Sequence, residues 1–146
     1  MTRLLFPGSF APFTKGHQDI VLRALAFADE VVVAIGTNAE KDGLLSIAER
    51  KERIERLFAN EPRVSVAVYS GLTADYARQV GAQAILRGVR SMHDYEYERT
   101  LADVNRTLSG IDTVLLLADP QLASISSSLV RELMAYGKDV SPFLPQ

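Results

Sequence analysis

The sequence predicts a single α/β domain built on a doubly wound, five-stranded parallel sheet with the strand order 3-2-1-4-5. Two observations predict this class. Short apolar runs at residues 4–6 and 31–35 lack polar alternation, as expected of strands that are buried on both faces. Five strand-like segments alternate with helical ones, which is typical of a parallel sheet covered by helices. The strand order is a hypothesis, because periodicity does not reveal which strands are neighbours.

The first half of the chain is predicted to hold strands at residues 4–6, 31–35 and 64–68. A helix over residues 18–27 separates the first two and has an apolar face that includes Phe27. The next helix, residues 46–59, begins with a capping box in which Ser46 caps the first turn and Glu49 reaches back. The charged run at residues 50–53 is predicted to form its solvated face.

The second half continues the alternation. A short helix is predicted at residues 73–80, a strand at 84–86, a long helix at 94–108 and a fifth strand at 114–117. A final helix starts at residue 129 and stops near Gly137, since glycine favours helix C-termini. Pro142 and Pro145 predict an extended tail. No repeat or interdomain linker interrupts the pattern, so residues 1–146 are predicted to be one domain.

The composition narrows the function classes. The 146 residues contain no cysteine, which excludes disulfides, thiolate metal sites and a cysteine nucleophile. Two histidines are too few for a histidine-built metal centre, so no protein metal ligand is predicted. A net charge of −2 argues against a nucleic-acid partner. No apolar run reaches the length of a membrane span and no secretory pattern is present, so a cytoplasmic protein without a membrane partner is expected.

A loop at residues 7–17 joins the first strand to the first helix and is suited to phosphate. Gly8 and Gly16 can adopt backbone angles closed to other residues, and a side chain at either position would block the approach of a ligand. The helix N-terminus that follows offers unpaired N–H groups to an anion, and His17 lies on its first turn. The alternative from spacing alone is an ordinary strand–helix connection with an incidental histidine.

Two further segments could bind anions. Arg87 and Arg90 follow the fourth strand with Gly88 between them, and guanidinium groups suit phosphate oxygens. Residues 126–128 are three serines before a helix, which supply hydroxyls and free N–H groups. The alternatives are surface arginines and ordinary helix capping. With the predicted strand order, the first loop faces the arginine segment across one crevice.

These segments carry a family resemblance. Thr14-Lys15-Gly16-His17 matches the [HT]xGH motif of the nucleotidyltransferase superfamily. Residues 87–90 match an RGxR stretch that precedes an acidic-aromatic helix, and residues 125–132 match the element ISSS[LM][VI][KR]E. In order and spacing, nearly the whole chain resembles the bacterial phosphopantetheine adenylyltransferase family. The resemblance implies a Rossmann-like nucleotidyltransferase fold and an adenylyltransferase of coenzyme A synthesis.

The resemblance also implies roles for individual residues. It implies that His17 contacts the α-phosphate of ATP, that Lys41 bridges phosphates of the two substrates, and that Arg87 meets phosphopantetheine; these three are the candidate catalytic residues. The implied ATP-binding residues are Ser9, Phe10, His17, Gly88, Val89, Arg90, Glu98, Leu122, Ala123, Ser124, Ile125, Ser126, Ser127 and Ser128. The implied phosphopantetheine-binding residues are Ser9, Lys41, Leu72, Thr73, Arg87 and Asn105. Read without the resemblance, Lys41 is a solvated lysine and Glu98 a solvent-facing helix residue.

In the implied reaction, the adenylyl group of ATP is transferred to 4′-phosphopantetheine, which gives dephospho-coenzyme A and pyrophosphate. Mg²⁺ is expected to arrive with the nucleotide. Coenzyme A and dephospho-coenzyme A are expected as product-like ligands, and relatives imply a homohexamer. One position departs from the family pattern, because Ala11 stands where an aspartate is usual. The alternatives are therefore a non-catalytic nucleotide- or coenzyme-A-binding protein, or another small-molecule nucleotidyltransferase. Thr14 and residues 126–128 disfavour the latter.

Overall fold

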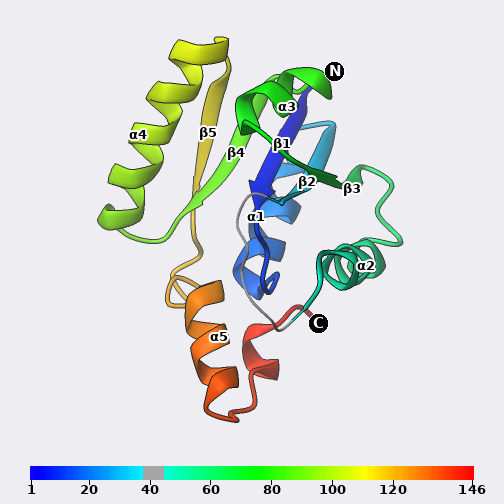
Figure 1. The fold of residues 1–146 in the computed structure, drawn as a ribbon, viewed down its shortest axis with the longest axis vertical. Helices are drawn as coiled ribbons and strands as arrows, with labels where there is room; N and C mark the ends of the chain where they lie inside the picture. The colour runs from blue at the N-terminus through cyan, green and yellow to red at the C-terminus, as the bar shows by residue number, and fades with distance from the viewer. Residues whose placement is uncertain (38–44) are drawn as a thin grey trace.

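A computed structural model describes residues 1–37 and 45–146 of the chain. It confirms a five-stranded parallel sheet with the order β3-β2-β1-β4-β5 (Figure 1). The strands are β1 (Arg3–Gly8), β2 (Glu30–Gly36), β3 (Val64–Tyr69), β4 (Ala84–Val89) and β5 (Asp112–Leu117). The helices are α1 (Lys15–Ala24), α2 (Ile47–Leu57), α3 (Thr73–Gln79), α4 (Met92–Ser109) and α5 (Ser127–Ala135). Within these ranges, no helix is long and apolar enough to cross a membrane.

Most element boundaries differ from the sequence prediction by a few residues, and helix α1 and the tail differ most clearly. Helix α1 begins at Lys15, three residues early, because Thr14 caps its first turn. It also ends at Ala24, which leaves Phe27 51% exposed and not on the buried face as predicted. The tail is not extended throughout, since a 3₁₀ turn spans Ser141–Phe143 and has proline in its first turn.

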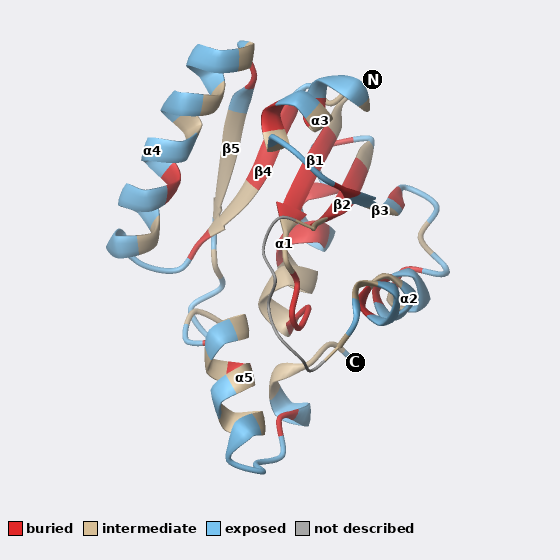
Figure 2. Cartoon of the chain, in the orientation of Figure 1, coloured by how far each residue is buried: buried red, intermediate tan, exposed pale blue. Residues whose placement is uncertain are grey.

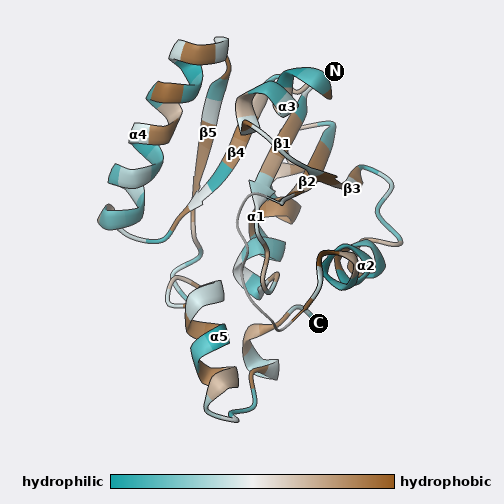
Figure 3. Ribbon diagram, viewed as in Figure 1, coloured by the Kyte–Doolittle hydropathy of each residue, from teal (hydrophilic) through white to brown (hydrophobic). Residues whose placement is uncertain are grey.

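The sheet carries a hydrophobic layer on each face, and its central strands are buried (Figure 2). On one face, Leu4 and Val33 pack with Val21 of α1 and Ile54 of α2. On the other face the strands pack against α3, and α4 lies against α3, β4 and β5. Figure 3 shows apolar colours on the central strands and polar colours over most of α2. Parallel strands buried on both faces explain the continuous apolar runs of the sequence.

The sheet opens between β1 and β4. Strand β1 pairs with β2 from Arg3 to Gly8, but it pairs with β4 only at Leu4 and Leu5. Beyond that point the two strands diverge, so their carboxyl ends border a crevice. This is the position at which the strand order reverses, where ligands bind in doubly wound folds. Helix α5 lies beyond this edge with a small core of its own, centred on Val130 (Figure 1).

Candidate functional site

The loop between β1 and α1 forms one wall of the crevice. Gly8 and Gly16 do not use the left-handed backbone region that is open to glycine, and the loop residue with a positive φ is Phe10, at 48°. Gly8 is needed for space: a Cβ atom there would lie 3.0 Å from the Phe10 ring. The Phe10 ring is 3% exposed and turns inward over Gly8. The absence of a side chain at Gly8 therefore determines the path of the loop.

Thr14 and His17 form a reciprocal cap at the start of α1. The Thr14 hydroxyl accepts a hydrogen bond from the His17 backbone N–H at 3.3 Å. In return, the Thr14 backbone N–H donates to Nδ1 of His17 at 2.9 Å. A neutral imidazole that accepts at Nδ1 carries its proton on Nε2. The motif thus fixes the tautomer of His17 and leaves Nε2–H as the group that can donate.

His17 is held neutral by its surroundings. Its ring packs among Phe6, Phe10 and Phe13, with ring centroids 5.0–6.1 Å away. Burial, followed by the positive charges of Arg87 and Arg90, lowers the pKa of His17 to about 3. At neutral pH the imidazole is therefore an uncharged donor, oriented by Thr14 and lining the crevice.

The backbone carbonyls of the loop are bound by donors from distant elements. Nη1 of Arg87 donates to Pro7 O at 2.7 Å, across the gap between β1 and β4. Nη1 of Arg131 donates to Ala11 O, and the Ser127 hydroxyl donates to Pro12 O, both at 2.7 Å. These bonds fix the loop from β4 and α5, so its geometry depends on the tertiary fold.

Arg50 contributes a further bond of this kind and corrects a prediction. The sequence predicts that Arg50 faces solvent, but the residue is 5% exposed and its Nη1 donates to Ser9 O. Burial lowers the pKa of its guanidinium. It borders a smaller cavity of about 160 Å³ behind the loop, also lined by Phe13 and Leu144. The alternation of charges along α2 could not show that Arg50 turns inward.

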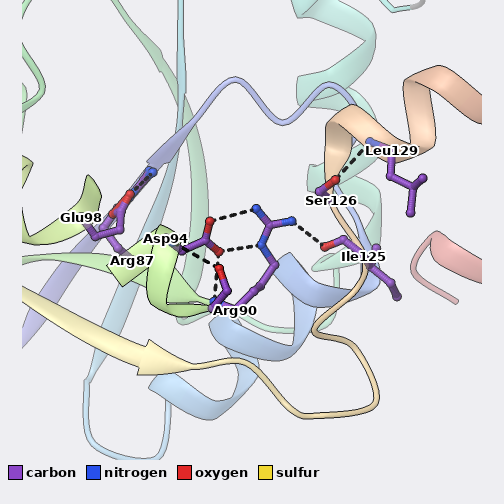
Figure 4. Close-up of polar contacts among 8 residues, drawn as sticks. Arg87, Arg90, Asp94, Glu98, Ile125, Ser126 and Leu129 are labelled. Atoms are coloured by element: carbon purple, nitrogen blue, oxygen red, sulfur yellow. Dashed lines mark hydrogen bonds and ion pairs between the residues drawn. The ribbon is translucent and has the colours of Figure 1, made fainter. Parts of the chain in front are cut away.

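Arg87 and Arg90 are ion-paired (Figure 4). Arg87 binds both carboxylate oxygens of Glu98, with 2.8 Å between Nη2 and Oε1. Burial opposes the charge of Arg87, but the hydrogen bond and negative charge of Glu98 prevail and raise its pKa. Arg90 pairs with Asp94 at 2.9 Å and also donates to Ile125 O. The solvent-facing alternative for Glu98 is wrong, since its side chain is 5% exposed.

The three serines before α5 have separate contacts. Ser126 is the N-cap and its hydroxyl accepts from the Leu129 N–H at 3.0 Å. Ser127 binds the β1–α1 loop through Pro12 O, and the Ser128 hydroxyl accepts from Nη2 of Arg131 at 3.2 Å. Capping accounts for the first serine, and contacts to the loop and to Arg131 account for the other two.

The crevice is a pocket of about 450 Å³. It brings together most of the residues that the sequence analysis selected, namely Ser9, Phe10, His17, Arg87, Gly88, Arg90, Glu98, Leu122, Ile125, Ser126, Ser127 and Ser128. Val89, Ala123, Ser124, Leu72, Thr73 and Asn105 do not line it. Thr73 instead shares a hydrogen bond with Tyr69 at 2.8 Å, and Leu72 is 59% exposed. Lys41 lies outside the described residues.

Sequence reasoning missed two arginines of this region, Arg50 and Arg131. Arg131 lines the pocket and stands inside the serine element that the sequence analysis quoted, so its position was a usable signal. Arg50 directly follows the predicted capping box, of which the structure shows the Ser46 cap, but nothing in the sequence marks Arg50 as buried. Over residues 1–37 and 45–146, no group of three or more histidine and carboxylate side chains could hold a metal ion.

The fold and the pocket define a class, a doubly wound α/β protein that gathers histidine, arginine and serine side chains in a pocket at the carboxyl ends of its strands. The model of the cytidylyltransferase-like family matches residues 5–133. The chain is 56% identical to the phosphopantetheine adenylyltransferase of Phocaeicola vulgatus over 146 residues, 100% of this chain and 97% of the relative. It is 59% identical to that of Porphyromonas gingivalis over 142 residues, 97% and 93% of the two chains. The chain belongs to the cytidylyltransferase-like family and, within it, to the phosphopantetheine adenylyltransferases.

A solved structure supports the fold. The bifunctional NMN adenylyltransferase/ADP ribose pyrophosphatase of Francisella tularensis superposes with a TM-score of 0.70 over 98% of this chain and 44% of that one. The sequence identity is 17%, so the likeness concerns the fold alone.

Proposed function

We propose that the protein transfers the adenylyl group of ATP to 4′-phosphopantetheine. A phosphate oxygen of 4′-phosphopantetheine attacks the α-phosphorus of ATP and forms the new P–O bond. The bond from the α-phosphorus to the bridging oxygen breaks, and pyrophosphate leaves with that electron pair. The nucleophile is already an anion, so the step requires no general base. Catalysis then depends on positioning and on neutralising the charge that spreads over the oxygens.

The geometry of His17 is the observation that carries this proposal. Its Nε2–H is a neutral, oriented donor at the first turn of a helix, where phosphate binds readily. Such a donor stabilises developing charge on the α-phosphate without having to reorganise. Arg87 lies across the same crevice and supplies positive charge from β4. The N-terminus of α5, with residues 126–128, supports binding of the remaining phosphates.

Several roles rest on the resemblance. We propose that Lys41 bridges the two substrates, and that Leu72, Thr73 and Asn105 bind the pantetheine arm, with coenzyme A and dephospho-coenzyme A as product-like ligands. In the pocket, the carboxylates of Asp94 and Glu98 are paired with arginines. Since these residues do not form a protein-built Mg²⁺ site, Mg²⁺ is proposed to arrive with ATP, held by phosphate oxygens and water.

A cytoplasmic homohexamer is likewise proposed from the resemblance. An exposed apolar row along α4 supports assembly between copies. Tyr97, Leu101, Val104 and Leu108 recur at helical spacing and are 61%, 36%, 47% and 60% exposed. A contiguous apolar row of this kind is typical of a surface that packs against another chain.

The test of the function is product formation. Purified protein with ATP and Mg²⁺ should release pyrophosphate only when 4′-phosphopantetheine is present, and mass spectrometry should identify dephospho-coenzyme A. ATP should be preferred to CTP. Equal or better turnover of nicotinamide mononucleotide would contradict the substrate assignment. Binding of ATP without turnover would favour the non-catalytic alternative.

Replacing Ala11 with aspartate is expected to change turnover by less than tenfold. Ala11 is buried and contributes its carbonyl to Arg131, and its methyl group does not line the phosphate pocket. The measurement is kcat and KM for ATP in the Ala11→Asp variant. A rise in kcat of a hundredfold or more would show that Ala11 impairs catalysis in the natural chain, and would support the binding-protein alternative.

A further inference from the structure

The cavity of about 160 Å³ behind the β1–α1 loop, the rear cavity, has mostly apolar walls that include Phe13, Ile54 and Leu144. An apolar cavity of about 150 Å³ is large enough to hold a benzene ring. Phe10 belongs to the walls of both the rear cavity and the crevice. A molecule in the rear cavity would therefore contact the back of the loop whose front lines the crevice.

Two arginines of α2 border the rear cavity without an acidic partner. Arg50 and Arg53 both line it, and none of the lining residues that the structure describes is an aspartate or a glutamate. The other basic residues of α2, Lys51 and Arg56, each pair with a glutamate of the same helix. Across the part of the chain that the structure describes, no carboxylate pairs with Arg50 or Arg53. The rear cavity therefore carries two positive charges that an anionic ligand can balance.

Arg50 has no partner at the edge of its guanidinium that binds carboxylates elsewhere in this protein. Arg87 and Arg90 each hold a carboxylate through Nε and Nη2 (Figure 4). Arg50 uses Nη1 for Ser9 O, whereas its Nε is buried and, like Nη2, has no hydrogen-bond partner among the described residues. An unpaired buried donor is costly. A carboxylate that reaches Nε and Nη2 from the rear cavity removes that cost and leaves the bond to Ser9 in place.

We propose that the rear cavity binds a small carboxylate with an aromatic or branched aliphatic body. The carboxylate pairs with Arg50 and Arg53, and the body lies against the apolar walls. A neutral apolar molecule would leave both charges unbalanced, and an inorganic anion would leave the apolar walls uncovered. Because Arg50 holds Ser9 O and the Phe13 ring centroid lies 5.3 Å from that of His17, the occupant stabilises the loop from behind. The site is distinct from the crevice, so this proposal does not rest on the proposed function.

The experiment is a titration of the natural protein with benzoate, followed by NMR of its methyl groups. Benzoate should shift the signals of Ile54 and Leu57, which line the rear cavity, and not those of Ile20 and Ile125, which line the crevice. Benzamide has the same shape without the charge and should bind at least roughly tenfold more weakly, because hydrogen bonds between charged groups are the strong ones. Unchanged signals of Ile54 and Leu57, or equal affinities for benzoate and benzamide, would overturn the proposal.

Variants of α2 test the two arginines separately. Arg50→Lys keeps the charge but loses the Nε and Nη2 edge, and should weaken benzoate binding at least about tenfold. Arg53→Gln should weaken it roughly two- to fivefold, the effect of an exposed ion pair. This second variant changes an exposed side chain, so it tests the site even where Arg50→Lys does not fold.

The matched control is Arg56→Gln. It removes the same charge from the same helix at a position that does not line the rear cavity, and should leave the affinity for benzoate unchanged. An equal loss of affinity in Arg53→Gln and Arg56→Gln would mean that benzoate responds only to the overall charge of α2, and would refute the site.

Discussion

Replacing His17 with alanine is expected to lower turnover by roughly 10²–10³, as does removal of a single donor to a developing oxyanion. We expect the loss of stabilisation in the transition state, since charge builds on the α-phosphate there and Nε2–H is the donor left on a ring that lines the pocket. Affinity for ATP should weaken much less, because a contact made mainly in the transition state adds little ground-state binding. Turnover, ATP affinity and melting temperature are measured on one preparation. Unchanged turnover in a folded variant would refute this role for His17.

The stability control for this variant is His17→Gln. The imidazole also caps α1 and contacts three phenylalanine rings. The alanine substitution should therefore lower the free energy of unfolding by about 1 kcal/mol, more than a substitution at a surface position would. Glutamine at this capping position can accept from the Thr14 N–H and restore the cap. It should recover most of the stability while turnover stays at least tenfold low. Recovery of full turnover with glutamine would show that the cap alone matters.

The pKa of His17 gives this variant a pH signature. The folded pKa of about 3 lies below the ordinary value of 6.5, so the unfolded chain takes up a proton first as pH falls. His17 therefore lowers the free energy of unfolding progressively from pH 6.5 towards 3, and its contribution is fully retained above 6.5. The difference in unfolding free energy between the natural protein and His17→Ala should accordingly shrink and then change sign as the solution is acidified below pH 6.5.

The second large effect is expected on stability, in Glu98→Gln. Glu98 is nearly fully buried and holds Arg87 through both oxygens, and Arg87 in turn holds Pro7 O. Removing the charge leaves the Arg87 guanidinium without its carboxylate. We expect the free energy of unfolding to fall by about 3 kcal/mol, the lower end for buried ion pairs, because the Arg87 side chain is 30% exposed. For a chain of this size, the melting temperature should fall by roughly 6–12 °C. Thermal unfolding followed by circular dichroism measures it.

Helix α4 offers a matched control in Asp103→Asn. That substitution breaks the Arg99–Asp103 pair, whose side chains are 64% and 67% exposed. Exposed ion pairs contribute little to the free energy of unfolding, so the melting temperature should hardly change. Equal effects of the two substitutions would mean that burial of the Arg87–Glu98 pair does not determine its strength. A stable Glu98→Gln protein would show that Arg87 is held by other contacts.

Much of the fold was predictable because its signals are local. The apolar runs of β1 and β2 reflect burial on both faces, and the Ser46 cap is set by residues three positions apart. The strand order is confirmed, although it came from the fold class and not from periodicity. The one-domain assignment of residues 1–146 and the roles of individual residues stay predictions. Phe27 was misplaced because helical periodicity continues past the point where α1 ends.

The sequence by itself determined the alternation of strands and helices and the segments that gather at the pocket, since motif and periodicity are properties of neighbouring residues. Only the tertiary structure decided how those groups are arranged. Arg50 turns inward and donates to Ser9 O, which is 41 positions away in the sequence, and Arg131 donates to Ala11 O, which is 120 positions away. Arg87 is paired because α4 folds Glu98 back onto β4. Charge pairing and burial depend on atoms that meet only after folding, so the pattern of one segment cannot reveal them.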